Sequence, residues 1–227
     1  MEYHNNKIET LQEVRDTVLK AELPPLQTRD MISAIKRICE MAGMAPAMFP
    51  AKAPAIRAML AKIRPAAHGV SHKTWANLLS RFRGALKFAG VIDPMGQGTA
   101  MLHPDWAPLV QAIADDKRQS CGQAAFANWC AMRNISPQQV NDTVVQRFFG
   151  WLETRTLCPK PRDVVRRVPH LWNEASDKIG IWPNMLFSPY IGTKVPLMRT
   201  WLRTVSMLPS MVAPIVGPLT TPSRIVS

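Results

Sequence analysis

Apolar residues recur along this chain at intervals of three and four positions, the spacing that places side chains on one face of an α-helix. Alternating apolar and polar positions, the pattern of a half-buried strand, are scarce, and the glycine signals of tight hairpins are missing. The sequence therefore predicts an all-α fold. Helices are expected over residues 8–21, 28–42, 54–64, 71–89, 105–114, 117–133 and 162–178, with a further helix beginning at residues 136–137.

Capping residues, glycines and prolines set the expected ends of these helices. Thr28 and Ser71 are typical N-caps, because their hydroxyl groups accept hydrogen bonds from the free amides of a first helical turn. Gly43 and Pro65 follow the last residues of two helical patterns and are expected to end them. Pro169 lies inside the pattern over residues 162–178 and is expected to kink or split that helix.

The helix predicted over residues 71–89 has the clearest division into two faces. One face is expected to be core and consists of Trp75, Leu78, Leu79, Phe82 and Leu86. The opposite face carries Lys73, Arg83 and Lys87 around the small or polar residues Asn77, Ser80 and Gly84, with Arg81 on its flank. We expect a rod such as a phosphate backbone to approach this second face closely.

Two changes along the chain predict its domain organisation. The turn-rich stretch 94–98 separates an N-terminal basic helical domain, residues 1–92, from a second helical bundle, residues 99–182. After this bundle the helical periodicity degrades and prolines recur. Residues 183–227 are therefore predicted to form an irregular tail, with disorder left open and no core contribution expected after Thr204.

The charge is distributed unevenly, although the whole chain has a net charge of +12 and a pI near 10.1. Residues 41–92 contain no Asp or Glu and eight Lys or Arg, which are Lys52, Arg57, Lys62, Arg64, Lys73, Arg81, Arg83 and Lys87. Helix surfaces built for solubility usually interleave both signs, whereas phosphate binding disfavours neighbouring carboxylates. We therefore predict that these eight side chains bind double-stranded DNA. A merely solvated face is the alternative.

A second and weaker basic patch lies over residues 160–167. It comprises Lys160, Arg162, Arg166 and Arg167, diluted by Asp163. Arg166 and Arg167 join the predicted DNA-binding residues, with a solvated surface equally open. Phe88 lies off the apolar stripe beside the basic face, and it is expected to pack on a neighbouring helix; stacking on a nucleotide is the alternative.

Patterns that carry catalysis or bind cofactors are absent from the sequence. His68 and His72 have the spacing of a helical metal site, but Gly69 and the cap at residue 71 place them in a turn without a nearby Cys or carboxylate. Gly96 and Gly98 lack the Lys-Ser or Lys-Thr of a phosphate-binding loop. We predict no catalytic residue, no metal site, no cofactor and no small-molecule substrate.

The cysteines and the uncharged runs indicate the cellular compartment in which the protein is expected. Cys39, Cys121, Cys130 and Cys158 show no Cys-x-x-Cys spacing, and no charged-then-apolar leader opens the sequence. The thiols are therefore expected to be reduced and the protein cytoplasmic. Prolines interrupt the uncharged runs near the end of the chain, so no membrane span is predicted.

Three segments carry a resemblance to a known family. They are TWANLLSRFRGALKFAGV over residues 74–91, FANWCAMRNISPQQVNDTVVQRFFGWLE over residues 126–153, and RDVVRRVPHLWNEA over residues 162–175. In spacing and helical layout they resemble the N-terminal half of bacterial tyrosine recombinases, the phage-type site-specific integrases. The resemblance spans roughly residues 28–182. It implies two SAM-like or core-binding-like helical modules that clamp DNA.

The chain departs from that family where cleavage chemistry is concerned. The family cuts DNA in a separate C-terminal domain through a tyrosine nucleophile, aided by arginines and a His-x-x-Arg motif. No His here is followed by Arg three residues later, and the only tyrosines are Tyr3 and Tyr190. The resemblance therefore implies a DNA-binding portion, truncated or naturally shortened, that does not recombine DNA alone. Self-association and pairing with a full-length integrase are both open, and so is whether the chain belongs to an enzyme.

Two other classes remain as alternatives. A small helical transcriptional regulator is also basic and is distinguished by strong discrimination for one operator. A basic interaction or peripheral-membrane module would use residues 71–89 as an amphipathic helix, and anionic vesicles would then compete with DNA.

Overall fold

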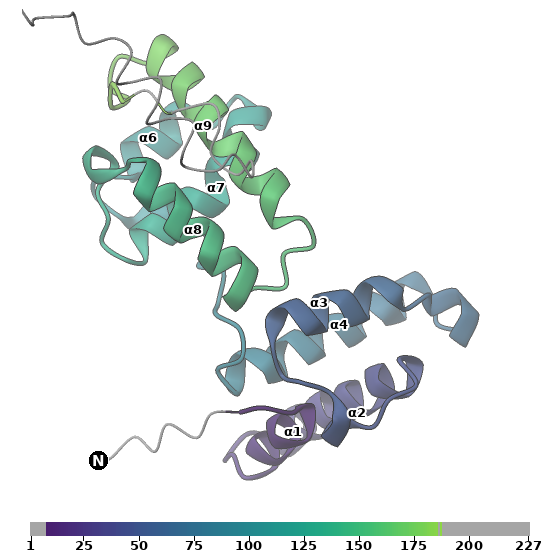
Figure 1. Cartoon of the computed structure of the whole chain (residues 1–227). Coiled ribbons are helices and arrows are strands. Elements are labelled where there is room, and N and C mark those ends of the chain that lie inside the picture. Colours follow the sequence, from purple (N-terminus) through teal and green to yellow (C-terminus); the bar gives the residue numbers. More distant parts are fainter. Residues whose placement is uncertain (1–7, 186, 188–227) are drawn as a thin grey trace, which may run out of the picture. The chain divides into compact units, whose positions relative to one another are not determined.

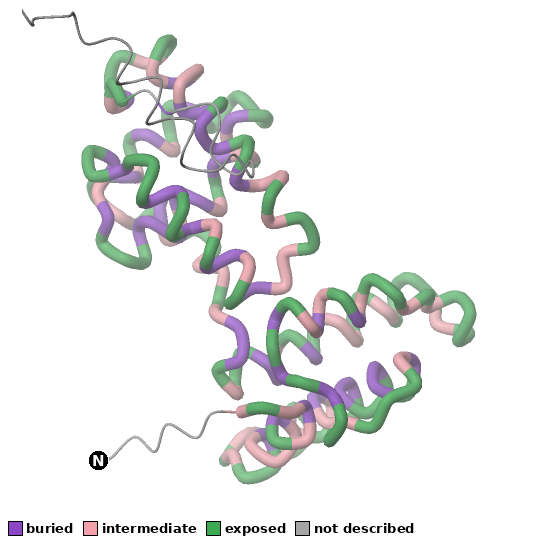
Figure 2. The backbone as a smooth tube through the Cα atoms, in the orientation of Figure 1, coloured by how far each residue is buried: buried purple, intermediate pink, exposed green. Residues whose placement is uncertain are grey.

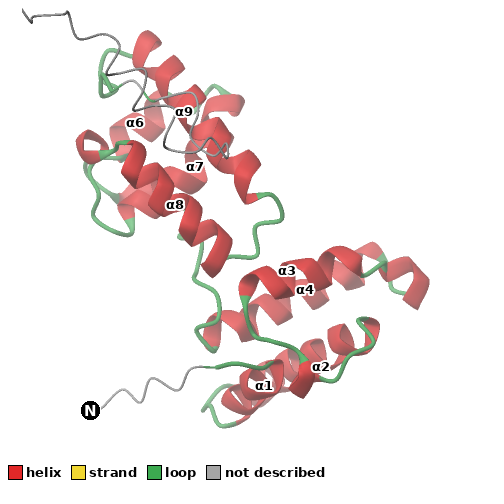
Figure 3. Ribbon diagram, in the orientation of Figure 1, coloured by secondary structure: helices red, strands yellow, loops and turns green. Residues whose placement is uncertain are grey.

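The computed structural model describes residues 8–185 and residue 187, which form helices joined by turns and loops (Figure 1). No strand occurs in this part of the chain, as the colouring in Figure 3 shows, apart from an isolated antiparallel bridge between Thr10 and Pro50. The predicted all-α fold is confirmed. The α-helices are α1 (Leu11–Leu19), α2 (Pro25–Met41), α3 (Ala53–Lys62), α4 (His72–Phe88), α5 (Thr99–Leu102), α6 (Ala107–Ala112), α7 (Lys117–Ala131), α8 (Asp142–Arg155) and α9 (Pro161–Lys178), and the 3-10 turns are η1 (Pro46–Met48), η2 (Pro65–His68) and η3 (Pro137–Gln139).

Helices α1 to α4 surround a first hydrophobic core within the predicted residues 1–92. Each helix contributes the residues of one apolar face, and Figure 2 shows buried and exposed positions alternating along these helices. Burial of each large apolar side chain stabilises the fold by about 1.5–3 kcal/mol relative to exposure. The completely buried members are Leu11, Val14, Val18, Ile35, Ile38, Ile56, Phe82, Ala85 and Leu86.

The N-cap of helix α2 lies four residues earlier than predicted. The expected cap Thr28 lies inside the first turn, and its backbone amide donates to the carbonyl of Pro24, the actual N-cap residue. Pro25 takes the first helical position, where a missing N–H costs nothing because that amide has no intrahelical partner. The prediction that Thr28 caps this helix is therefore wrong, whereas Gly43 follows the helix end as expected, with a φ of 66°.

Helix α4 begins where the sequence predicted, but its apolar face is only partly covered. The Ser71 hydroxyl accepts a hydrogen bond from the amide of Thr74, 3.2 Å away, as an N-cap does. Phe82 and Leu86 are completely buried, whereas Trp75 only packs against the edge of the core and stays partly exposed. The prediction of a core position for Trp75 is thus met only in part.

Helices α5 to α9 enclose a second core, within which aromatic rings touch one another. The ring centroids of Phe126 and Phe148 lie 5.2 Å apart, and Trp106 meets Trp172 edge to face at 6.2 Å. The indole N–H of Trp106 donates to the carbonyl of Ile135 at 2.8 Å. Both cores belong to one compact unit, and the second lies in the range predicted for the second bundle and reaches a little beyond it.

Helix α9 runs without interruption through Pro169, so of the two expected outcomes, a kink or a split, the split does not occur. A proline ring removes one helical hydrogen bond and crowds the preceding turn. Here Pro169 is buried beside Val168 and Leu171, and burial of this apolar face against the second core offsets the local loss.

The second core reaches past Trp182, into the stretch predicted to be an irregular tail. Phe187 is buried, and its ring centroid lies 5.6 Å from that of Trp172. The side-chain amide of Asn173 forms two hydrogen bonds with the backbone of Phe187. Its N–H donates to the Phe187 carbonyl at 3.2 Å, and its oxygen accepts from the Phe187 amide at 2.9 Å. The rest of the tail prediction, residues 188–227 with Tyr190 and Thr204, lies outside the described residues, as does Tyr3.

None of the described helices has the length and apolar character needed to cross a membrane.

Candidate nucleic-acid interface

Three of the predicted cations share one side of α4. Lys73, Arg83 and Lys87 are all exposed, and at 100° per residue they fall within an arc of roughly 80°. The buried residues Phe82 and Leu86 lie on the other side of the helix. None of the three cations forms an ion pair with any residue that the structure describes. The helix therefore presents three uncompensated positive charges on its outer side.

Three further cations flank α3. Lys52 immediately precedes the helix, Lys62 is its last residue, and Arg64 lies between α3 and η2. All three are exposed and have no ion pair within the described part of the chain. Lys62 also lies at a helix C-terminus, where the helix dipole favours a positive charge. Six of the eight cations predicted in residues 41–92 are therefore exposed and unpaired among the described residues.

Arg57 is engaged within the protein. One of its terminal nitrogens donates to the carbonyls of Leu152 and Thr156 at 2.8 and 3.1 Å, and the other donates to the carbonyl of Glu153 at 2.8 Å. These carbonyls lie at the C-terminal end of α8, where the last four carbonyls have no intrahelical donor. Arg57 therefore acts as a side-chain cap for α8. Its guanidinium is bonded within the protein, whereas the sequence analysis assigned it to the DNA-binding surface.

Arg81 is paired with an acid that the sequence segment does not contain. Its guanidinium lies 3.0 Å from the carboxylate of Asp30, which comes from α2. Arg29 approaches the same carboxylate at 3.8 Å. The lack of Asp and Glu in residues 41–92 therefore does not make the whole surface free of acids, and Arg81 contributes less positive potential than its neighbours.

Gly84 serves helix packing. A Cβ atom built on this residue would lie 3.1 Å from the terminal methyl of Met31, so α2 closely approaches α4 at this point. Gly84 was expected to let a phosphate backbone approach the basic face. Its small size instead lets the Met31 side chain of α2 pack against α4. The open arc of α4 lies on the side of Ser80 and Lys87 instead.

The second predicted patch is exposed on α9. Arg166 is 70% exposed, and its distance of 3.8 Å from Asp163 makes a weak surface ion pair. Arg167 is exposed and has no ion pair among the described residues, and the same holds for Lys160 and Arg162. The patch keeps most of its positive charge.

Phe88 remains 45% exposed at the end of α4, so a neighbouring helix covers it only in part. It lies next to Lys87 in the sequence but about 100° away around the helix. The partly exposed Phe88 side chain therefore borders the basic arc.

The described residues contain no group of three or more His, Cys, Asp or Glu side chains able to hold a metal ion. Cys39 and Cys130 are buried, and burial raises the pKa of both thiols. For Cys39 the pKa rises to about 11, first through burial and then through the negative charge of Glu40.

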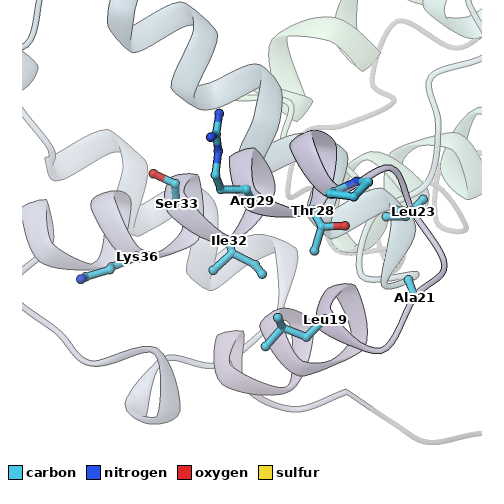
Figure 4. Close-up of a pocket in the computed structure, with 9 residues that line it drawn as sticks. Leu19, Ala21, Leu23, Thr28, Arg29, Ile32, Ser33 and Lys36 are labelled. Carbon is cyan, nitrogen blue, oxygen red and sulfur yellow. The ribbon is translucent and has the colours of Figure 1, made fainter.

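An open hollow of about 630 Å³ lies between the end of α1 and the first half of α2 (Figure 4). Its walls are largely apolar, with Leu19, Leu23 and Ile32, and the cations Arg29 and Lys36 stand at its edge. Both cations have acidic neighbours at 3.8–3.9 Å. The hollow includes none of the ten predicted DNA-binding residues.

Comparison of the chain with protein-family models, with curated proteins and with solved structures finds no match in any of the three.

Proposed function

We propose that this protein binds double-stranded DNA, mainly through phosphates, by means of the exposed cations along α3 and α4. The observation that supports the proposal best is the set of six exposed side chains without ion pairs among the described residues. A high local density of uncompensated positive charge is favourable next to a polyanion and otherwise destabilises the fold by self-repulsion. These side chains are Lys52, Lys62, Arg64, Lys73, Arg83 and Lys87.

The proposed mode of binding has a characteristic salt dependence. Each phosphate neutralised releases about 0.9 counterions, so six contacts reduce affinity roughly a thousandfold between 50 and 200 mM salt. Phosphate contacts carry no sequence information directly, so discrimination between DNA sequences is expected to be weak. The proposal thus makes binding strong in dilute buffer and weak at high salt.

The proposal extends to a role beside a site-specific integrase of the tyrosine recombinase type. Of the segments that carry the resemblance, the first covers α4 from its third residue to its end, the second runs from α7 through most of α8, and the third lies within α9. In this role the protein holds a DNA site and leaves cleavage to another polypeptide. Both self-association and pairing with a full-length integrase are compatible with that role.

The test compares two variants that remove the same charge. In the first, Lys73, Arg83 and Lys87 are changed to Gln; in the control, the exposed residues Lys20, Lys36 and Lys117, which lie outside both basic patches, are changed to Gln. We expect the first variant to lose about three units of salt slope and the control to lose much less. Equal losses, or none in either variant, would contradict the assignment of α4.

One observation favours a second candidate function, a peripheral membrane module. The apolar side chains Trp75, Leu78 and Leu79 of α4 are only partly covered, as in a helix that lies in a membrane interface. Vesicles with anionic lipids, added as competitors in the binding assay, distinguish the two functions. If anionic vesicles displace the duplex at equal charge concentration and vesicles of neutral lipid do not, the membrane function is favoured.

A further inference from the structure

A second group of arginines gathers in the bundle formed by α5 to α9, at positions that charge patterning alone did not select. Arg147 and Arg155 lie eight residues apart on α8 with Trp151 midway, so the three side chains follow one stripe of the helix. Arg133 follows the end of α7, and its guanidinium stands 4.7 Å from the ring centroid of Trp129 and 5.3 Å from that of Trp151. We call these three arginines the Trp151 cluster.

A single carboxylate, that of Asp93, lies against the cluster. Asp93 accepts from Arg155 at 2.8 and 3.1 Å and from the indole N–H of Trp151 at 2.7 Å, whereas Arg133 lies 3.8 Å away. Arg147 is exposed and has no ion pair among the described residues. Three guanidinium groups against one carboxylate leave two positive charges uncompensated.

The acids of α8 do not reduce this excess. Asp142 and Glu153 project from the side of the helix away from the Arg147–Trp151–Arg155 stripe, at 100° per residue. The cations also repel one another: the pKa of Arg133 is lowered chiefly by burial and further by the charge of Arg147, against the opposing effect of Asp93. An added anion would relieve this repulsion.

We propose that the Trp151 cluster is an anion-binding site that takes a phosphodiester group of a nucleic acid. The proposal rests on the proposed function for its ligand, and it adds a contact in the second bundle separate from those along α3 and α4. Guanidinium forks match phosphate oxygens with paired hydrogen bonds. Two tryptophan rings hold Arg133 in place, so little side-chain freedom is lost when an anion binds.

The test removes the unpaired member of the cluster. Arg147→Gln leaves the Asp93 contacts intact, so the fold is expected to persist, as checked by circular dichroism. Lys117→Gln is the matched control, because it removes the same charge at the start of α7. That helix is roughly 20 Å long, and Arg133 of the cluster follows its other end. We expect Arg147→Gln to lower the salt slope of duplex binding by about 0.9 and the affinity about eightfold at 100 mM salt. The control should change both much less.

The α4 variant with Lys73, Arg83 and Lys87 changed to Gln separates this inference from the proposed function. Loss of binding in the α4 variant with no loss for Arg147→Gln overturns the Trp151 cluster alone. Loss for Arg147→Gln with none for the α4 variant supports the cluster and overturns the assignment of α4. Equal losses for Arg147→Gln and Lys117→Gln show a general charge effect and overturn the cluster. Failure of the unaltered protein to bind duplex in dilute buffer overturns both proposals.

A local readout distinguishes phosphate from carboxylate ligands. The indole N–H resonance of Trp151, bonded to Asp93, should shift when a short duplex is titrated into the protein and should shift less in Arg147→Gln. Polyglutamate serves as the competing probe. A shift produced equally well by polyglutamate at the same charge concentration would overturn the phosphodiester assignment and indicate an acidic protein partner.

Discussion

Replacement of Arg57 by Ala should destabilise the protein while leaving its DNA binding unchanged. Its guanidinium donates three hydrogen bonds to carbonyls at the end of α8, from positions 95 to 99 residues away along the chain. A hydrogen bond from a charged donor contributes about 1.5–3 kcal/mol, and an unsatisfied buried carbonyl costs about 1–3 kcal/mol. The three bonds share one side chain and water replaces part of them, so we expect a loss of about 3 kcal/mol in the free energy of unfolding.

Urea unfolding followed by tryptophan fluorescence measures this loss, and thermal melting should show a decrease of about 6–12 °C. Lys62→Ala is the control on the same helix, since Lys62 is exposed and its replacement should cost less than about 0.5 kcal/mol. Arg57→Lys should fall between the two, because an ammonium group on a shorter reach retains fewer of the three bonds. Stability of Arg57→Ala within 0.5 kcal/mol of the unaltered protein would refute the capping role.

The same variant tests the revised assignment of the DNA-binding residues. At a temperature where Arg57→Ala is folded, its salt slope for duplex binding should equal that of the unaltered protein, because the guanidinium is already bonded to α8. A slope lower by about 0.9 would instead place Arg57 on the DNA, as the charge pattern alone predicted.

Two further outcomes follow from local structure. Ser71→Ala should lower the free energy of unfolding by about 1 kcal/mol through loss of the cap on α4, and Ser71→Asp should restore most of it; urea titration checks both. With a thiol reagent at pH 8, exposed Cys121 should react first, whereas Cys39, with its pKa raised to about 11, carries only about one thiolate in a thousand and Cys130 reacts as slowly. Raising the pH towards 11 should accelerate Cys39, and rapid reaction of Cys39 at pH 8 would contradict its burial.

The features predicted correctly from the sequence are those encoded by neighbouring residues. The Ser71 cap and the buried positions Phe82 and Leu86 follow from spacing within one helix, which a periodic pattern records directly. The start of α2 was missed because a proline in the first turn competes with Thr28 as the cap signal.

The features that were missed join residues far apart in the chain. Nothing in residues 41–92 indicates that Asp30 neutralises Arg81, or that Arg57 reaches the end of α8, since both contacts depend on tertiary packing. The Trp151 cluster differs in this respect. Its spacing of Arg147, Trp151 and Arg155 every four residues is visible in the sequence, but the segment also contains acids, so it does not stand out as an acid-free stretch.

The pairing of Asn173 with Phe187 decides where this polypeptide can be cut for experiments. A fragment that stops at Trp182, the predicted end of the second bundle, would strip Phe187 from the rings of the second core and leave the Asn173 amide without its two backbone partners. Recombinant pieces that carry the second bundle should therefore retain residue 187.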